Sequence, residues 1–260
     1  STITKIGDFE HLKQSEKIAE TITLKGDHVC VPGFIDAHTH ICFGGSRAKD
    51  YAMRNAGKSY LEIARAGGGI WDTVTQTRKA TQEELTKSTI KLANRHLKNG
   101  TTTIEVKSGY GLSVDEELKM LRAIKEANNT ALPDLIPTCL AAHMLPKDFQ
   151  GTETEYLSEI ADRLFPILKS EKLANRIDAF IGLGCDFTPA RKLLDAGAAL
   201  AIASDHNPGS APMGDLLTQA SILGTFQKLT NAEILSGITF RAAAALKLED
   251  RGKLEAGYLA

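Results

Sequence analysis

The sequence predicts an α/β fold in which strands and helices alternate around a (β/α)8 barrel, the TIM-barrel arrangement, with an incomplete set of strands. Short apolar runs alternate along the chain with segments whose apolar residues recur at helical spacing. Polar residues directly follow several of these runs, and barrels of this kind carry their functional residues at the carboxyl ends of the strands. The length of 260 residues fits one large domain or two small ones.

The strand-like runs are rich in β-branched residues and most of them end at a loop that contains glycine or proline. They occupy residues 31–37, 101–107, 134–140, 176–181 and 198–204. A closed barrel needs eight strands in about 250 residues, so either some strands escape recognition or the barrel is incomplete. Residues 1–30 are mixed, and a strand-like run at residues 21–24 predicts the edge of a small β element ahead of the main domain.

The helical segments fill the intervals between these runs. In residues 81–98 the apolar side chains of Leu85, Ile90 and Leu97 recur at helical spacing, and Asn99-Gly100 is a typical left-handed helix end. The other expected helices lie at residues 50–55, 59–66, 114–128, 153–170, 189–196, 215–226 and 232–246.

Composition excludes several classes of partner. The net charge of −1 and the pI near 6.7 argue against binding to nucleic acid or to an anionic membrane. No apolar run is long enough to span a bilayer, and residues 1–5 lack the apolar core of a signal peptide. Four distant cysteines without Cys-x-x-Cys spacing indicate reduced thiols, so we expect a cytoplasmic enzyme.

The first apolar run ends in His38-Thr-His40. Side chains two residues apart on a strand point to the same side, so both imidazoles would meet just beyond the strand end. Asp36 lies on that same face. Imidazole is a common ligand of zinc, iron and nickel, so this pair predicts a metal site, although a structural histidine pair is the alternative.

Asp205 follows the apolar run at residues 198–204. A carboxylate at this strand end could complete the metal site and orient or deprotonate the water molecule that reacts there. On its own, an aspartate before Asn-Pro-Gly is usually a turn residue. The His-x-His pair earlier in the chain favours the metal role.

Four further side chains follow expected strands. Arg47 could bind a carboxylate through two hydrogen bonds, although a solvated loop arginine is equally expected. Tyr110 is expected to be exposed enough to hydrogen-bond a ligand, with packing over the turn as the alternative. His143 is equally compatible with a structural role. Lys107 would bridge two metal ions only if it were carboxylated, and a lysine at the rim of the core is the preferred interpretation.

Two segments, Pro32 to His40 and Ser204-Asp205, resemble the amidohydrolase superfamily. Finer motifs resemble its imidazolonepropionase family, and they follow that family's order across about residues 30–250. These motifs are His38 to Arg47, Gly67 to Gly69, Glu105 to Gly111, Ala142-His143 and Asp205 to Ser210.

The resemblance implies a barrel over residues 31–250 and a small β-sandwich built from residues 1–30 and 251–260. It also implies one bound zinc or iron ion and the hydrolysis of 4-imidazolone-5-propanoate, a small-molecule substrate, to N-formimidoyl-L-glutamate in histidine degradation. The family is also compatible with a homodimer.

The resemblance assigns roles to individual residues. His38, His40 and Asp205 would be metal ligands, and Asp205 would also be catalytic. The substrate would be held by Arg47, Tyr110, His143, Asn207, Gly209 and Ser210, with Arg47 pairing with the propanoate.

The chain also departs from the family pattern. The family carries a third ligand histidine, an acidic residue after it and a further histidine, yet this chain has no histidine between His143 and His206. The sequence therefore looks like the family with a central block removed. Two alternatives stay open: a barrel that binds without turnover, and another cyclic-amide hydrolase or deaminase of the superfamily. Arg47 and Tyr110 argue against a guanine or cytosine deaminase, whose substrates carry no propanoate.

Overall fold

The computed structural model describes residues 1–15, 17–179 and 190–260. Its centre is a parallel sheet of four strands in the order β1-β2-β3-β4. These strands are β1 (Phe34–Asp36), β2 (Thr101–Lys107), β3 (Asp134–Ala142) and β4 (Ile177–Ala179). Because spatial neighbours follow chain order and the connections are helical, the sheet has the topology of half a barrel. The prediction of an incomplete (β/α) barrel is confirmed to this extent.

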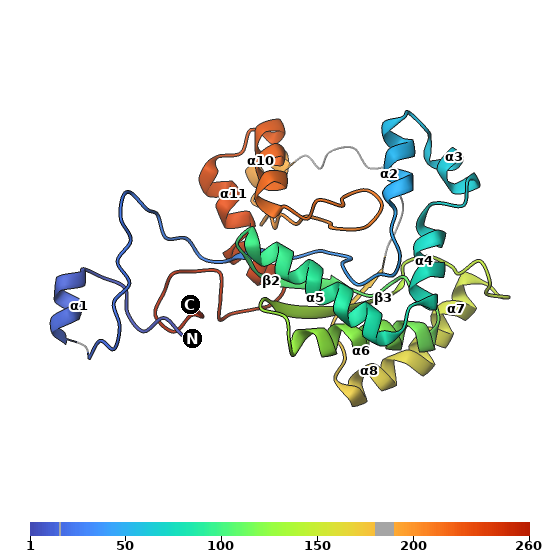
Figure 1. The fold of residues 1–260 in the computed structure, drawn as a ribbon, viewed down its shortest axis with the longest axis horizontal. Helices are drawn as coiled ribbons and strands as arrows, with labels where there is room; N and C mark the ends of the chain where they lie inside the picture. Colours follow the sequence, from blue (N-terminus) through green and yellow to red (C-terminus); the bar gives the residue numbers. More distant parts are fainter. Residues whose placement is uncertain (16, 180–189) are drawn as a thin grey trace.

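The helices surround this sheet, and Figure 1 shows α5, α6 and α8 on one side of it with α10 and α11 on the other. The segments up to β3 are α1 (Phe9–Ser15), α2 (Ala48–Asn55), α3 (Tyr60–Arg65), α4 (Ile70–Lys79), α5 (Gln82–Lys98) and α6 (Val114–Asn128). The later segments are α7 (Glu153–Glu159), a π-helical turn (Ile160–Leu164), α8 (Phe165–Glu171), α9 (Ala190–Asp195), α10 (Leu216–Gln227), α11 (Asn231–Gly237) and α12 (Phe240–Ala245).

Every expected helix has a counterpart, but two of them are divided. The helix expected at residues 153–170 contains the π-helical turn, and the helix expected at residues 232–246 breaks into α11 and α12. Helix α4 was not expected. It begins directly after Gly69, whose φ of +85° is readily adopted only by glycine.

Two expected strands are wrong. Residues 198–204 form no strand: the Ile202 amide donates to the Gly237 carbonyl, and beyond this run only an isolated parallel bridge joins Thr39 and His206. Residues 21–24 are also irregular, and Ile22 is 81% exposed. An alternating or apolar run needs a partner strand to form a ladder, and neither run has one among the described residues. The end of the fourth expected strand, at residues 180–181, lies outside the described residues.

The main core lies between the sheet and helices α5 and α6. Ile104 and Val106 on β2 pack with Leu85 of α5 and Leu121 of α6, and all four side chains are completely buried. Fully burying one such side chain stabilises the fold by about 1.5–3 kcal/mol. This core fixes α5 and α6 against the back of β2 and β3.

Helix α5 has a well-defined beginning and end. The Thr81 hydroxyl accepts a hydrogen bond from the Glu84 amide, and the Glu84 carboxylate accepts one from the Thr81 amide. After the C-cap residue Asn99, Gly100 has a φ of +86°, which confirms the helix end predicted there. Its last turn therefore holds His96 at a fixed position beside the sheet.

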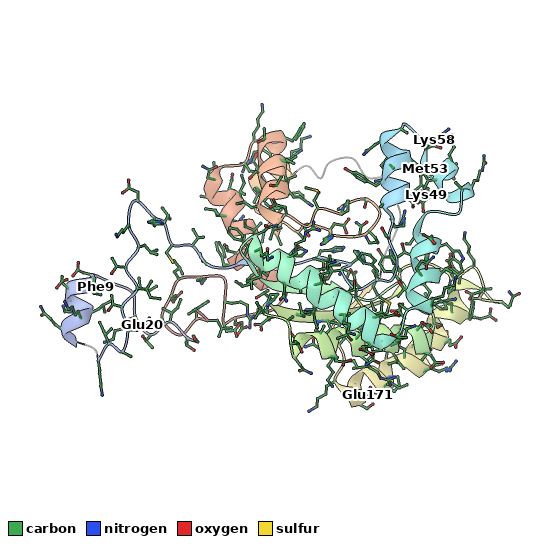
Figure 2. All side chains as sticks on the ribbon, viewed as in Figure 1. Phe9, Glu20, Lys49, Met53, Lys58 and Glu171 are labelled. Carbon is green, nitrogen blue, oxygen red and sulfur yellow. The ribbon has the colours of Figure 1, made fainter. Side chains whose placement is uncertain are left out.

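The first 33 residues are mostly irregular and extend away from the sheet (Figure 1). Figure 2 shows Phe9 and Glu20 on this arm, far from the core. The arm meets the other end of the described chain through an isolated antiparallel bridge between Thr2 and Leu259. One bridge is not a sheet, so these contacts do not establish the expected β-sandwich.

Three cysteines, Cys30, Cys42 and Cys139, are free thiols, while Cys185 lies outside the described residues. Among the helices that the structure describes, none combines the length and the apolar character required to cross a membrane.

Candidate active site

His38 and His40 extend beyond the end of β1 and lie beside the loop that contains Asp205. The Asp205 amide donates to the His38 carbonyl at 3.0 Å, and the His40 amide donates to the His206 carbonyl at 2.8 Å. The two imidazole rings are 5.3 Å apart, measured between centroids. The expected convergence of the two rings past the strand end is therefore present.

The Asp205 carboxylate faces both rings. Its Oδ1 is 3.6 Å from Nε2 of His38 and 3.5 Å from Nε2 of His40. The candidate ligand atoms of the three residues all lie within 4.8 Å of one another, which is the spacing of donors around one ion. Within the described residues this is the only such cluster of three or more side chains.

The electrostatics of this cluster also suit a cation. Burial, with a smaller contribution from Lys107, lowers the pKa of His38 to about 4, and burial lowers the pKa of His40 well below 6.5. Both rings are therefore neutral at pH 7 and keep a lone pair for a metal. Burial raises the pKa of Asp205, although a hydrogen bond from Asn207 opposes this effect.

Lys107, at the end of β2, forms two ion pairs. Its Nζ lies 2.7 Å from Glu105 Oε1 and 2.8 Å from Asp178 Oδ2. This buried, ion-paired position agrees with the interpretation of Lys107 as a lysine at the rim of the core. Together with Asp178 it lines a cleft of about 1210 Å³ beside β4.

Tyr110 and His143 lie on the other side of His40. The His143 ring is 5.5 Å from the rings of both His40 and Tyr110, and the Tyr110 ring is 5.9 Å from that of His40. Nδ1 of His143 is 2.8 Å from the Gly109 carbonyl, so this nitrogen carries the proton. The expectation that Tyr110 is exposed is wrong: the side chain is buried, because the loop folds inward, and burial raises the pKa of its hydroxyl.

Arg47 is buried and already has a carboxylate partner. Its Nε donates to Asp50, while its Nη1 lies 3.4 Å from the Thr73 hydroxyl. The guanidinium also lies directly against Gly209, where an added Cβ would be 2.8 Å from Nη1. The structure therefore brings Arg47 and the Asp205 loop together.

The Asn207 side chain forms hydrogen bonds within its own loop. Its Oδ1 accepts from the amides of Gly209 and Ser210, and its Nδ2 donates to the Asp205 carbonyl at 2.7 Å. These bonds form the turn that follows Asp205. Asn207, Gly209 and Ser210 therefore lie together beside the candidate metal ligands.

His206 points away from the site. Its Nδ1 lies 2.7 Å from Nε2 of His96, a residue that the sequence pattern did not single out. Asp36 belongs to this buried group as well, and not to the ligand cluster as its position on the strand had indicated. Its Oδ2 is 3.6 Å from Nδ1 of His96, and its Oδ1 accepts from the Ser204 amide.

Glu117 of α6 is a second residue that was not predicted. Its buried carboxylate accepts hydrogen bonds from the amides of Gly109, Gly111 and Leu112 at 2.8–3.0 Å. It thereby shapes the loop that carries Tyr110. A glutamate within the apolar stripe of the predicted helix was the available signal, because a buried carboxylate requires partners.

A family model described as "Amidohydrolase family" matches residues 106–260, more than half of the chain. The chain therefore belongs to the amidohydrolase family. The matched region includes Asp205 and begins after His38 and His40, which were recognised from the sequence motif.

Curated relatives narrow this classification. The chain is 32% identical to imidazolonepropionase of Vibrio vulnificus, across 98% of this chain and 82% of the relative. It is 34% identical to imidazolonepropionase of Pseudomonas aeruginosa, across 93% of this chain and 80% of the relative. The chain is thus a homologue of imidazolonepropionase.

The same alignment shows an internal difference in length. It spans 335 positions against the Vibrio relative, and because the chain has 260 residues, at least 75 of those positions have no counterpart here. A difference of this kind is expected if a block of the family sequence is absent from this chain, as the sequence motifs indicated.

Among solved structures, 5-methylcytosine deaminase of Klebsiella pneumoniae is similar with a TM-score of 0.59. It is 14% identical, and the match covers 88% of this chain and 78% of that one. N-isopropylammelide isopropylaminohydrolase of Burkholderia multivorans matches with a TM-score of 0.52 and 13% identity, across 88% and 78% of the two chains. At these identities the similarity establishes the fold alone.

Proposed function

We propose that the chain is a metal-dependent hydrolase that cleaves the cyclic amide C–N bond of 4-imidazolone-5-propanoate to give N-formimidoyl-L-glutamate. The observation that carries this proposal is the convergence of His38, His40 and Asp205, with Arg47 packed against Gly209 of the Asp205 loop. A metal centre next to a buried guanidinium suits a substrate that has both a hydrolysable ring and a carboxylate.

His38, His40 and Asp205 would hold one zinc or iron ion. Their fit is supported by the spacing of their ligand atoms and by the neutral state of both imidazoles at pH 7. The chemistry that such an ion supplies when bound is activation of water and polarisation of a carbonyl group. Three protein ligands leave room for water and substrate, as in many catalytic zinc sites.

The chain's own residues would handle the substrate and the proton. Arg47 would pair with the propanoate, while Tyr110 and His143 would hold the ring next to His40. Asp205 would accept the proton of the attacking water and pass it to the ring nitrogen that leaves, so that water adds across the C–N bond. The raised pKa of Asp205 suits this role, because a base with a higher pKa binds the proton more readily.

Asn207, Gly209 and Ser210 would shape the wall of the substrate site. Asn207 would do so mainly through the turn, because its amide is already bonded within the loop. A homodimer and a cytoplasmic location remain part of the proposal.

A second candidate function is supported by the alignment. At least 75 aligned positions have no counterpart here, and the family resemblance implies that the absent block would include a further ligand histidine and an acidic residue. A chain without them could bind a small carboxylate through Arg47 without turning it over. The two candidates differ in whether the ring is opened.

The deciding experiment measures metal content and hydrolysis on the same purified protein. We expect about one zinc or iron ion per chain after reconstitution, and loss of 4-imidazolone-5-propanoate accompanied by N-formimidoyl-L-glutamate. Asp205→Asn should abolish hydrolysis, and Arg47→Met should raise KM at least about tenfold, which corresponds to about 1.4 kcal/mol of lost binding. Binding of substrate with no product in the metal-loaded protein would favour the second candidate.

A further inference from the structure

Asp205 has an unusual backbone conformation. Its φ of +48° lies in the left-handed region, which residues other than glycine rarely adopt. Such a conformation persists only where the surrounding structure holds it. In Asp205 it turns the carboxylate toward His38 and His40, so the contacts that maintain it also maintain the candidate metal site.

The two neighbours of Asp205 are held from the side opposite to the site. The Ser204 amide donates to Asp36 Oδ1 at 2.9 Å, and Nδ1 of His206 lies 2.7 Å from Nε2 of His96. All four side chains are buried, with exposures of 0–2%. The residue between these two attachments therefore projects its own side chain in the opposite direction.

The attachment at His206 connects distant parts of the chain. His96 belongs to α5, which the main core fixes against the sheet, and His206 lies 110 positions later. The loop closes over the His206 ring at Gly214, where an added Cβ would be 2.4 Å from Nδ1. Among the described residues, His96 is the side chain that hydrogen-bonds the His206 ring, and it links that ring to α5.

We propose that His96 is a positioning residue for the metal site, acting through His206 to keep Asp205 facing His38 and His40. The inference rests on the metal site of the proposed function and adds to it a residue that touches none of the three ligands. Residues that orient metal ligands in this way typically contribute 10–100-fold to metal affinity.

The test uses the different reach of asparagine and glutamine. The amide of glutamine occupies roughly the place of Nε2 in histidine, whereas the amide of asparagine occupies roughly the place of Nδ1, and both amides donate and accept hydrogen bonds. At position 96 the bond uses Nε2, so His96→Gln should keep it and His96→Asn should lose it. At position 206 the bond uses Nδ1, so the opposite pattern is expected: His206→Asn should keep the hydrogen bond to His96, and His206→Gln should lose it.

Cobalt binding to the full chain provides the readout. After removal of bound metal with a chelator, each variant is titrated with Co²⁺ and followed by visible absorption, while far-UV circular dichroism reports the fold. We expect His96→Gln and His206→Asn to bind Co²⁺ within about threefold of the unsubstituted chain. His96→Asn and His206→Gln should bind about 10–100-fold more weakly and with a changed spectrum.

If His96 acts by positioning, glutamine is the tolerated substitution at position 96 and asparagine is the tolerated one at position 206. General destabilisation of the fold would not produce opposite preferences at the two positions. Equal affinities and spectra for the asparagine and glutamine variants at both positions would overturn the inference. If either position yields one unfolded variant, the matched pair at the other position still decides. A folded, unsubstituted chain that fails to bind Co²⁺ would instead overturn the proposed metal site itself.

Discussion

The two sides of the candidate site are held in different ways. The β1 side comprises His38, His40 and Asp205, and its supporting residue is His96. The His96 ring forms one hydrogen bond, to the ring of His206, which lies 110 positions later in the chain. The β2 side comprises Tyr110 and His143, and its supporting residue is Glu117. The Glu117 carboxylate accepts hydrogen bonds from three backbone amides that lie five to eight residues earlier in the chain.

This difference separates local from long-range organisation. Glu117 and its partners belong to one strand-loop-helix unit, so the β2 side takes shape with that unit. The β1 side needs α5, β1 and the Asp205 loop to assemble first, and closing such long loops carries a larger entropic cost. We therefore expect the β2 side to depend on one carboxylate, and the β1 side to depend on several weaker contacts.

The largest effect is expected for Glu117→Leu. This change removes the acceptor of three buried amides, and each unpaired amide lowers the free energy of unfolding by about 1–3 kcal/mol. Part of this loss is offset, because the substitution also removes a buried charge. We expect a loss of about 4 kcal/mol in the free energy of unfolding, measured by urea denaturation. The exposed Asp115→Asn on the same helix is the control and should cost less than about 1 kcal/mol.

His96→Gln should change how stability depends on pH. Burial lowers the pKa of His96 to about 4 in the folded chain, against 6.5 for an unperturbed histidine. Between these values the unfolded chain binds the additional proton, so acidification destabilises the native protein by about 1.4 kcal/mol per pH unit for this group.

In metal-free protein, the unfolding free energy of the His96→Gln variant should therefore fall less steeply from pH 6.5 to pH 4. The difference should reach about 3 kcal/mol at the acidic end of this range. Parallel stability curves for the variant and the unsubstituted chain would show that His96 does not carry this dependence.

Glu117→Gln distinguishes the contribution of the negative charge from that of the individual hydrogen bonds on the β2 side. The glutamine oxygen can keep the bonds from Gly111 and Leu112 that Oε1 accepts, but its NH2 group would face the Gly109 amide. We expect a loss of about 2 kcal/mol in urea denaturation, about half that of Glu117→Leu. A loss equal to that of the leucine variant would mean that the negative charge matters more than the bond geometry.

The smallest effect is expected for Ser204→Ala on the β1 side. The Ser204 hydroxyl accepts from the His206 amide at 3.1 Å, while the Ser204 amide keeps its bond to Asp36. Removing one of several contacts should cost about 1 kcal/mol in thermal or urea unfolding. A cost comparable to that of Glu117→Leu would contradict the division between the two sides.

Much of the fold follows from local sequence patterns. The helical periodicity around Leu85 and the Asn99-Gly100 ending predict α5, because both depend on residues within a few turns. His38 and His40 are likewise visible, since two residues on extended backbone share a side. Asp205 is the harder case: its place after an apolar run and the motif resemblance both indicated it, although that run forms no strand.

The remaining features depend on contacts between distant segments. Residues 198–204 have the composition of a strand but lack a partner ladder within the part of the chain that the structure describes, which no local pattern reveals. The burial of Tyr110 follows from the Glu117 hydrogen bonds, and the role of His96 follows from a residue 110 positions away. Helix α4 was missed although Ile70, Trp71 and Val74 recur at helical spacing, because the segment is short and directly follows the glycine run at residues 67–69.

The left-handed backbone at position 205 also narrows the set of amino acids that evolution or a designer can use there. Asparagine, aspartate and histidine tolerate this conformation better than other non-glycine residues, whereas a glutamate would add strain in spite of its suitable charge. Only aspartate in this set is both compatible with the backbone and negatively charged at pH 7. At the candidate metal site, the backbone conformation therefore restricts which residue can occupy position 205, independently of any preference of the metal.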